Sequence, residues 1–134
     1  MINYILLIGA LLGLTSVGAG AYVDHVLVYT VDVKTLSMIK AALHHHELYA
    51  VIISAIGLVY CLKNNSIFLK LSAWIFIIGT VLFSFSIYLK ALTGMMAWIK
   101  LTPIGGTLLM VGWVLLACSS FKYINSESDR KLRI

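Results

Sequence analysis

The sequence predicts an all-α integral membrane protein: an antiparallel bundle of four transmembrane helices, with an amphipathic helix at the membrane interface between the first two. Of its 134 residues, 61% are hydrophobic and 11% charged, whereas soluble domains carry roughly 25% charged residues. A mean hydropathy of +1.00 does not fit a soluble domain of this length, because small domains have too much surface for their core. Four apolar segments each approach the ~20 residues that span a bilayer.

These segments predict one transmembrane domain, residues 1–124. The expected spans are residues 2–22, 43–62, 71–89 and 103–121, and a polar cytoplasmic tail follows over residues 125–134. Each span must be helical, because in lipid only a helix or a closed barrel satisfies the backbone, and barrel alternation is absent. Thr102-Pro103 predicts the start of the fourth helix, and Thr93-Gly94 the end of the third.

The second span is short. Its charge-free run, Leu48–Leu62, falls below the ~30 Å of a hydrocarbon core at ~1.5 Å per residue. We therefore expect residues 44–47 to form the first turn of this helix, near the lipid headgroups. Residues 32–43 either continue the helix outward or form the amphipathic helix along the interface, since their apolar side chains share one face.

The basic residues indicate the orientation. One side carries six: Lys63, Lys70, Lys122, Arg130, Lys131 and Arg133. The other carries four: Lys34, Lys40, Lys90 and Lys100. Because cytoplasmic loops carry the excess of Lys and Arg, both termini are predicted to be cytoplasmic.

A cluster of histidines and acids is the candidate metal- or pH-responsive site, predicted at the outer ends of the first two helices. Its members are Asp24, His25, His44, His45, His46 and Glu47. Imidazole and carboxylate groups suit Zn²⁺, Cu²⁺ or Ni²⁺, and histidine titrates near physiological pH. The alternative is that these residues form the polar rim of a membrane helix, where the positive end of the helix dipole stabilises the Glu47 carboxylate. No known ligand spacing is met, so no cofactor is predicted.

Small residues recur along the expected helices and predict close helix packing. They are Gly9, Gly13, Ser16 and Gly20 in the first span, Ser54 and Gly57 in the second, Gly79 in the third, and Gly105 and Gly112 in the fourth. We expect them to pack mostly within one chain.

Several function classes are disfavoured. No Asp, Glu, Lys or Arg is expected at the bilayer centre, which argues against an ion-coupled path through one chain. No catalytic motif is present, so we expect no enzyme. The net charge is +5, but the basic residues do not form a patch interleaved with aromatic residues. We therefore expect no nucleic-acid partner.

Two stretches carry a resemblance. "GTVLFSFSIYLKALTG" from Gly79 and "LTPIGGTLLMVGW" from Leu101 are similar to the YgdD-like family of small four-helix membrane proteins, and "GAGAYVDHVL" from Gly18 matches more loosely. The resemblance implies a four-helix protein of the bacterial cytoplasmic membrane. It implies no substrate, cofactor or catalytic residue, because the family is one of unknown function.

The sequence departs from the family pattern at two places. Phe85 replaces the usual glycine between two serines, so we expect one close helix contact to be lost or the ring to turn toward lipid. At the start of the second helix, Tyr49 takes the family's histidine position and His45 its aromatic one, whereas His25 matches the histidine after the first helix.

The leading hypothesis is a non-enzymatic accessory or structural membrane protein that packs with lipid or with another membrane protein. One alternative is an ion or small-solute transporter or channel, which requires a homo-oligomer because four short helices make a poor pore. The other is the outward-facing metal- or pH-responsive site.

Overall fold

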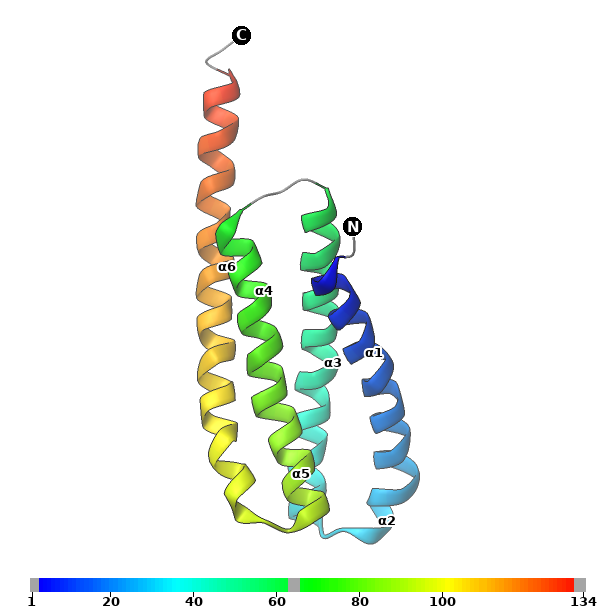
Figure 1. Ribbon diagram of the computed structural model, residues 1–134. Coiled ribbons are helices and arrows are strands. Elements are labelled where there is room, and N and C mark those ends of the chain that lie inside the picture. Colours follow the sequence, from blue (N-terminus) through cyan, green and yellow to red (C-terminus); the bar gives the residue numbers. More distant parts are fainter. Residues whose placement is uncertain (1–2, 63–65, 132–134) are drawn as a thin grey trace.

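The computed structural model describes residues 3–62 and 66–131, with side chains described as far as residue 120. Four helical stretches within these residues are long and apolar enough to cross a membrane: Tyr4–Thr30, Val33–Cys61, Ile67–Thr93 and Met96–Ser120. They run side by side in alternating directions (Figure 1). The predicted all-α class with four membrane-spanning helices is confirmed.

Two of the four stretches contain a π-helical turn, and one begins with a 3-10 turn. The first comprises α1 (Tyr4–Tyr22), the π-turn η1 (Val23–Leu27) and α2 (Val28–Thr30). The second is α3 (Val33–Cys61). The third comprises α4 (Ile67–Thr80), the π-turn η2 (Val81–Phe85) and α5 (Ser86–Thr93). The fourth comprises the 3-10 turn η3 (Met96–Lys100) and α6 (Leu101–Lys131).

The bundle is built from two helix pairs. α1 packs chiefly against α3, α6 packs chiefly against α4, and contacts between α3 and α4 join the two pairs. The N-terminal end of α1 and the C-terminal end of α6 point to the same end of the bundle (Figure 1). Residues 125–131 of the expected tail continue α6, and residues 132–134 lie outside the described residues.

The prediction of a separate amphipathic helix between the first two spans is wrong, because these residues belong to α3. α3 begins at Val33, capped by the Asp32 carboxylate, which accepts a hydrogen bond of 3.0 Å from the Thr35 backbone N–H. The segment does not lie free at the interface, because Ile39 and Ala42 are buried in the bundle. It forms the first turns of α3.

The two helix ends predicted from Thr93-Gly94 and Thr102-Pro103 agree with the structure. α5 ends at Thr93, and Gly94 adopts the left-handed conformation, with φ of 70°, that terminates many helices. Its N–H donates to the Lys90 carbonyl at 2.8 Å. α6 begins at Leu101, so Pro103 lies in its first turn, where its missing N–H costs no hydrogen bond.

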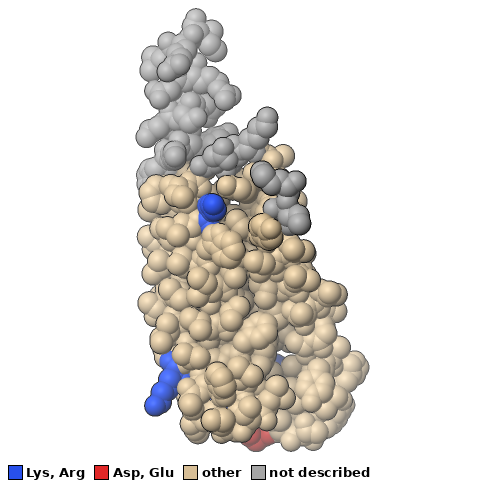
Figure 2. Space-filling view, viewed as in Figure 1, with Lys and Arg blue, Asp and Glu red and all other residues tan. Residues whose placement is uncertain are grey.

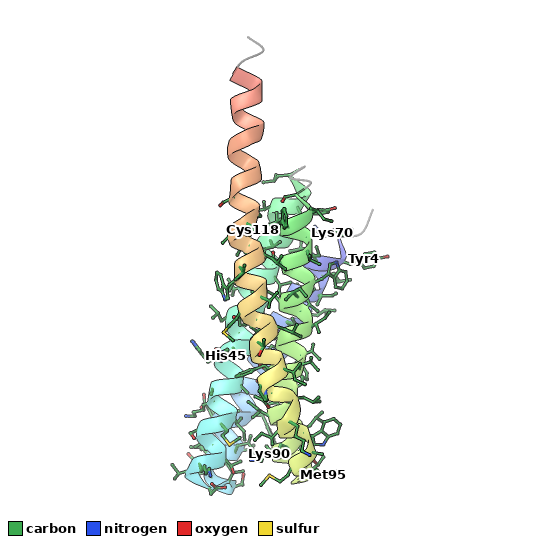
Figure 3. The ribbon with its side chains drawn as sticks, turned by 90° about the vertical axis from the view of Figure 1, so that its left-hand side faces the viewer. Tyr4, His45, Lys70, Lys90, Met95 and Cys118 are labelled. Carbon is green, nitrogen blue, oxygen red and sulfur yellow. The ribbon has the colours of Figure 1, made fainter. Side chains whose placement is uncertain are left out.

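Charged side chains mark the two ends of the apolar band. At one end Lys40 lies 3.8 Å from Asp24, with Lys90 nearby in the bundle; Lys70 lies toward the other end (Figure 3). Lys70 and Lys90 are twenty residues apart, which is ~30 Å along a helix and equals the thickness of a hydrocarbon core. Figure 2 shows one face, where charged residues lie toward the two ends and uncharged residues fill the band between.

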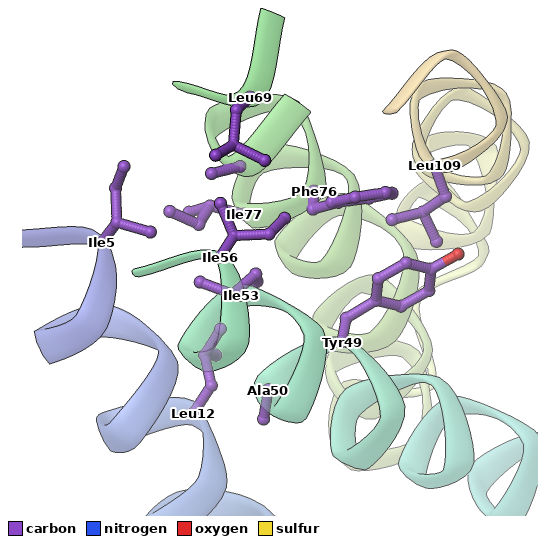
Figure 4. Packing of buried hydrophobic residues seen from close by; sticks show 11 residues of the cluster. Ile5, Leu12, Tyr49, Ala50, Ile53, Ile56, Leu69, Phe76, Ile77 and Leu109 are labelled. Carbon is purple, nitrogen blue, oxygen red and sulfur yellow. The ribbon is translucent and has the colours of Figure 1, made fainter. Parts of the chain in front are cut away.

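The buried hydrophobic cluster draws residues from α1, α3, α4 and α6 (Figure 4). Phe76 is 0% exposed. Its ring centroid lies 5.2 Å from that of Tyr49 and 5.5 Å from that of Trp113. The Trp113 indole N–H donates to the Tyr49 hydroxyl at 2.9 Å. An aromatic cluster therefore ties the two helix pairs together.

Candidate functional site

His44, His45, His46 and Glu47 do not form the first turn of their helix, as the sequence predicted that they would. These four residues lie in the middle of α3, because the helix begins at Val33. Figure 3 places His45 between the levels of Lys70 and Lys90. Glu47 is seven residues, or ~10 Å, beyond Lys40 along α3. If Lys40 marks one end of the ~30 Å apolar band, Glu47 lies roughly a third of the way across it.

Helix geometry separates the three consecutive histidines. Successive residues point in directions that differ by about 100°. His44 is exposed, His46 is 1% exposed, and His45 lies between these extremes. The His45 Nδ1 donates to the Ala41 carbonyl at 2.8 Å, and its ring packs 4.6 Å from that of Phe83.

The six candidate metal ligands lie on two different elements, η1 and α3. Asp24 pairs with Lys40, and His25 is exposed on η1. Over residues 3–62 and 66–131, no group of three or more His, Cys, Asp or Glu side chains could hold a metal ion. The structure therefore does not bring the six candidates together in one such group within its described residues.

The buried His46 instead belongs to a hydrogen-bonded chain that joins three helices. Its Nε2 lies 3.3 Å from the Thr15 hydroxyl and its Nδ1 3.4 Å from the Tyr88 hydroxyl. The Thr15 hydroxyl donates to the Leu11 and Leu12 carbonyls, at 3.0 and 3.1 Å. Since that proton is used, Nε2–H donates to Thr15 and Nδ1 accepts from Tyr88. A neutral imidazole satisfies every partner.

Phe85 covers this chain from the side. Its ring centroid lies 5.3 Å from that of His46 and 5.7 Å from that of Tyr88. The ring therefore faces the bundle, and the expected turn toward lipid is not seen. Beside it, in the same π-turn, the buried Ser84 hydroxyl donates to the Ala42 carbonyl of α3 at 2.9 Å.

Replacing Tyr88 with phenylalanine is expected to lower the free energy of unfolding by about 0.6 kcal/mol, the average measured for hydrogen bonds between membrane helices. The His46 Nδ1 then loses its donor in a buried site. Unfolding in mixed detergent micelles measures the change. Tyr29 is 84% exposed, so Tyr29→Phe is the control. Equal losses in the two variants would show that the Tyr88–His46 bond contributes nothing.

Glycines of α1 and α3 lie where the two helices approach most closely. A Cβ atom on Gly9 would lie 2.7 Å from the Ser54 backbone nitrogen. One on Gly57 would lie 2.7 Å from the Leu6 nitrogen. Both positions bring backbone against backbone, which larger side chains prevent.

The α4–α6 contact uses glycine in the same way. A Cβ on Gly79 would lie 2.7 Å from the Leu109 side chain, and one on Gly112 would lie 2.6 Å from the Phe76 ring. One on Gly105 would meet the backbone of Leu82 and Phe83 in η2.

A groove of about 500 Å³ follows one side of the α1–α3 contact. Small residues line it, among them Ala10, Gly13 and Ala55, and Glu47 lies on its wall. Gly13 leaves room there, since a Cβ would lie no closer than 4.0 Å to Ala50. The groove opens outward, because two of its lining residues are strongly exposed: Val17 at 73% and Val51 at 68%.

Further along α1, Ser16 and Gly20 continue this line. The Ser16 hydroxyl donates to the Gly13 carbonyl at 2.8 Å, so its polar group is satisfied within α1. A Cβ on Gly20 would lie 3.7 Å from Leu43 and 3.8 Å from the Glu47 Oε1. The Glu47 carboxylate thus lies beside Gly20.

Sequence reasoning missed the Thr15–His46–Tyr88 chain and both π-turns. Each of the three side chains has an ordinary explanation in isolation: an intrahelical hydroxyl, a rim histidine and an interfacial tyrosine. Their meeting depends on the relative rotation and offset of three helices. A sequence signal for the π-turns is not evident, since Val23–Leu27 and Val81–Phe85 contain no proline or glycine.

Comparison with known proteins places this architecture in a family. The family described as "Protein of unknown function (DUF423)" matches residues 19–106. A "UPF0382 membrane protein" of Haemophilus influenzae is 36% identical over 91% of this chain and 97% of its own length. The "UPF0382 inner membrane protein YgdD" of Escherichia coli K12 is 30% identical over 90% of this chain and 91% of its own length.

A third relative, a "UPF0382 membrane protein" of Staphylococcus haemolyticus, is 33% identical over 89% of this chain and 96% of its own length. No solved structure matches the chain. The family match and these near full-length similarities agree with the four apolar helices and with the resemblance seen in the sequence. The chain is a membrane protein of the DUF423 family of proteins of unknown function.

Proposed function

We propose that the protein is a non-enzymatic accessory component of the bacterial cytoplasmic membrane that binds a helix of another membrane protein along the α1–α3 groove. The groove is the observation that supports this role. Membrane helices associate by close van der Waals packing between small residues. The groove offers such residues on an outward face, at Ala10, Gly13 and Ala55.

The Thr15–His46–Tyr88 chain supports a structural rather than a catalytic role. Both ring nitrogens of His46 are engaged, by Thr15 and Tyr88, and the ring is 1% exposed. A general acid or base must reach the proton that it transfers. The ring nitrogens of His46 contact only Thr15 and Tyr88 of the same chain.

The proposed location and orientation rest on two further observations. The relative in E. coli is named an inner membrane protein. Both chain ends point to one end of the bundle (Figure 1), and the excess of Lys and Arg, six against four, favours the cytoplasm on that side.

Photo-crosslinking in native membranes tests the proposal. A photoreactive amino acid in place of Val51, which lies in the groove, is expected to give a discrete adduct with a membrane protein. The same label at Val114 on α6 is the control, because Val114 is 62% exposed and Val51 68%. Filling the groove with Ala10→Leu is expected to abolish the Val51 adduct.

Two results would contradict the proposal. Identical adducts from Val51 and Val114 would mean that the contact is not specific to the groove. An adduct from Val51 that persists in the Ala10→Leu variant would mean that the partner does not lie in it.

A further inference from the structure

The Glu47 carboxylate forms part of the wall of the α1–α3 groove. Its Oε1 lies beside Gly20 of α1, where a Cβ would be 3.8 Å away. The side chain is exposed on the outer face of the bundle and forms part of the groove wall with Gly13 and Val17. The groove is otherwise lined mainly by apolar and small residues, so Glu47 is its one ionisable lining residue.

This carboxylate lies within the membrane span. α3 extends fourteen residues to each side of Glu47, to Val33 and to Cys61. Lys40, whose side chain marks the end of the apolar band, is ~10 Å away along the helix. An acidic side chain at such depth is costly unless it is paired or reaches water.

No cation of the described chain compensates Glu47. Among the side chains that the structure describes, the one ion pair joins Lys40 to Asp24. His44, one turn before Glu47 on α3, forms no ion pair with it in that part of the chain. His46 is turned by about 100° from Glu47 around the helix, and its ring nitrogens are engaged by Thr15 and Tyr88. Glu47 therefore has no ion-pair partner among the side chains that the structure describes.

We infer that the groove binds a transmembrane helix that carries a lysine or arginine at the depth of Glu47, and that the two side chains form an ion pair. The inference rests on the proposed function, because it names the chemistry of the partner. The groove suits a helix in length: from Leu58 to Glu47 it follows eleven residues of α3, or ~16 Å and about three turns.

A second copy of this chain fits the groove poorly. A twofold axis along the membrane normal presents the same surface on both copies. Glu47 would then meet Glu47 at equal depth, which places like charges together in a medium of low dielectric constant. A partner with a basic residue removes this conflict, because buried charges in membranes pair with one another.

A depth scan with synthetic helices tests the inference. The full-length protein is placed in vesicles of phosphatidylethanolamine and phosphatidylglycerol with a labelled Leu/Ala transmembrane peptide. The peptide carries one lysine, moved residue by residue, or norleucine at the same position. Energy transfer between protein and peptide measures association. We expect affinity to peak with the lysine at Glu47 depth, about tenfold above the norleucine peptide, or about 1.4 kcal/mol.

Matched variants separate the inference from the proposed function. Glu47→Gln is expected to remove the peak and leave the norleucine peptide bound as before, whereas Glu47→Asp retains a peak. Ala10→Leu is expected to release both peptides. Circular dichroism and thermal unfolding establish that each variant is folded.

Three outcomes would overturn the inference. One is a flat scan in which lysine and norleucine peptides bind equally. If Ala10→Leu still releases them, the groove binds a helix and the proposed function survives without the ion pair. A second is a lysine peak that Glu47→Gln leaves unchanged. A third is self-association of labelled copies that displaces the peptide and is lost in Glu47→Gln, which would make a second copy the occupant.

Discussion

Replacing Phe76 with alanine is expected to lower the free energy of unfolding by about 3 kcal/mol, the largest loss that the structure predicts for a single side chain. Transfer from lipid contributes little, since lipid tails are as apolar as the core. The loss comes from the cavity and from the ring contacts with Tyr49 and Trp113, because aromatic pairs contribute about 0.5–1.5 kcal/mol each.

Phe68 is the matched control for Phe76. It lies two turns earlier on α4 and is 39% exposed, against 0% for Phe76, so Phe68→Ala removes a ring outside the buried core. We expect a change within about 0.5 kcal/mol, as for other surface substitutions. Detergent-induced unfolding followed by tryptophan fluorescence measures both variants. Similar losses at Phe76 and Phe68 would mean that the aromatic cluster is not the centre of stability.

Replacing Gly105 with alanine is expected to cost about 2 kcal/mol, within the range for overpacked cores. The added Cβ would meet the Leu82 carbonyl carbon at 2.8 Å and the Phe83 backbone nitrogen still more closely. Both atoms belong to the backbone of η2 and are not free to rotate away. α6 must therefore move away from η2, which loosens the α4–α6 pair.

Gly106 provides the control at the next residue. A Cβ there would lie 3.7 Å from the Phe83 ring, which is ordinary contact distance. Alanine favours a helix over glycine by about 1 kcal/mol, so Gly106→Ala is expected to leave stability unchanged or to raise it. Thermal unfolding of the two variants measures the difference. A Gly105→Ala protein as stable as Gly106→Ala would contradict the close α6–η2 contact.

The sequence was sufficient for the four helices but not for the extent of the second. Long apolar runs specify spanning helices, because lipid leaves the backbone no other open arrangement. Lys34 and Lys40 made the segment before His44 too polar to count as a span. The structure shows why it is nevertheless helical: Asp32 caps it, and Ile39 packs within the bundle at 1% exposure.

The sequence identified the polar residues of the candidate site, but it did not predict which of them contact one another. Adjacent histidines suggest a shared ligand, yet a helix turns consecutive side chains apart, so His44 and His46 face different surroundings. The contacts of His46 with Thr15 and Tyr88 depend on the packing of α1 and α5 against α3. Local sequence does not determine such packing. A membrane helix is apolar all round, so many rotations about its axis would bury an equally apolar face against its neighbours.

The two helix pairs also bear on how the chain reaches its folded state during synthesis. α1 packs against α3, the next long helix along the chain, and α4 packs against α6 in the same way. Contacts between near neighbours close short loops, which is fast and costs little entropy. The first hairpin can therefore assemble in the bilayer before the second has left the ribosome. The α3–α4 contacts then complete assembly by docking two preformed hairpins.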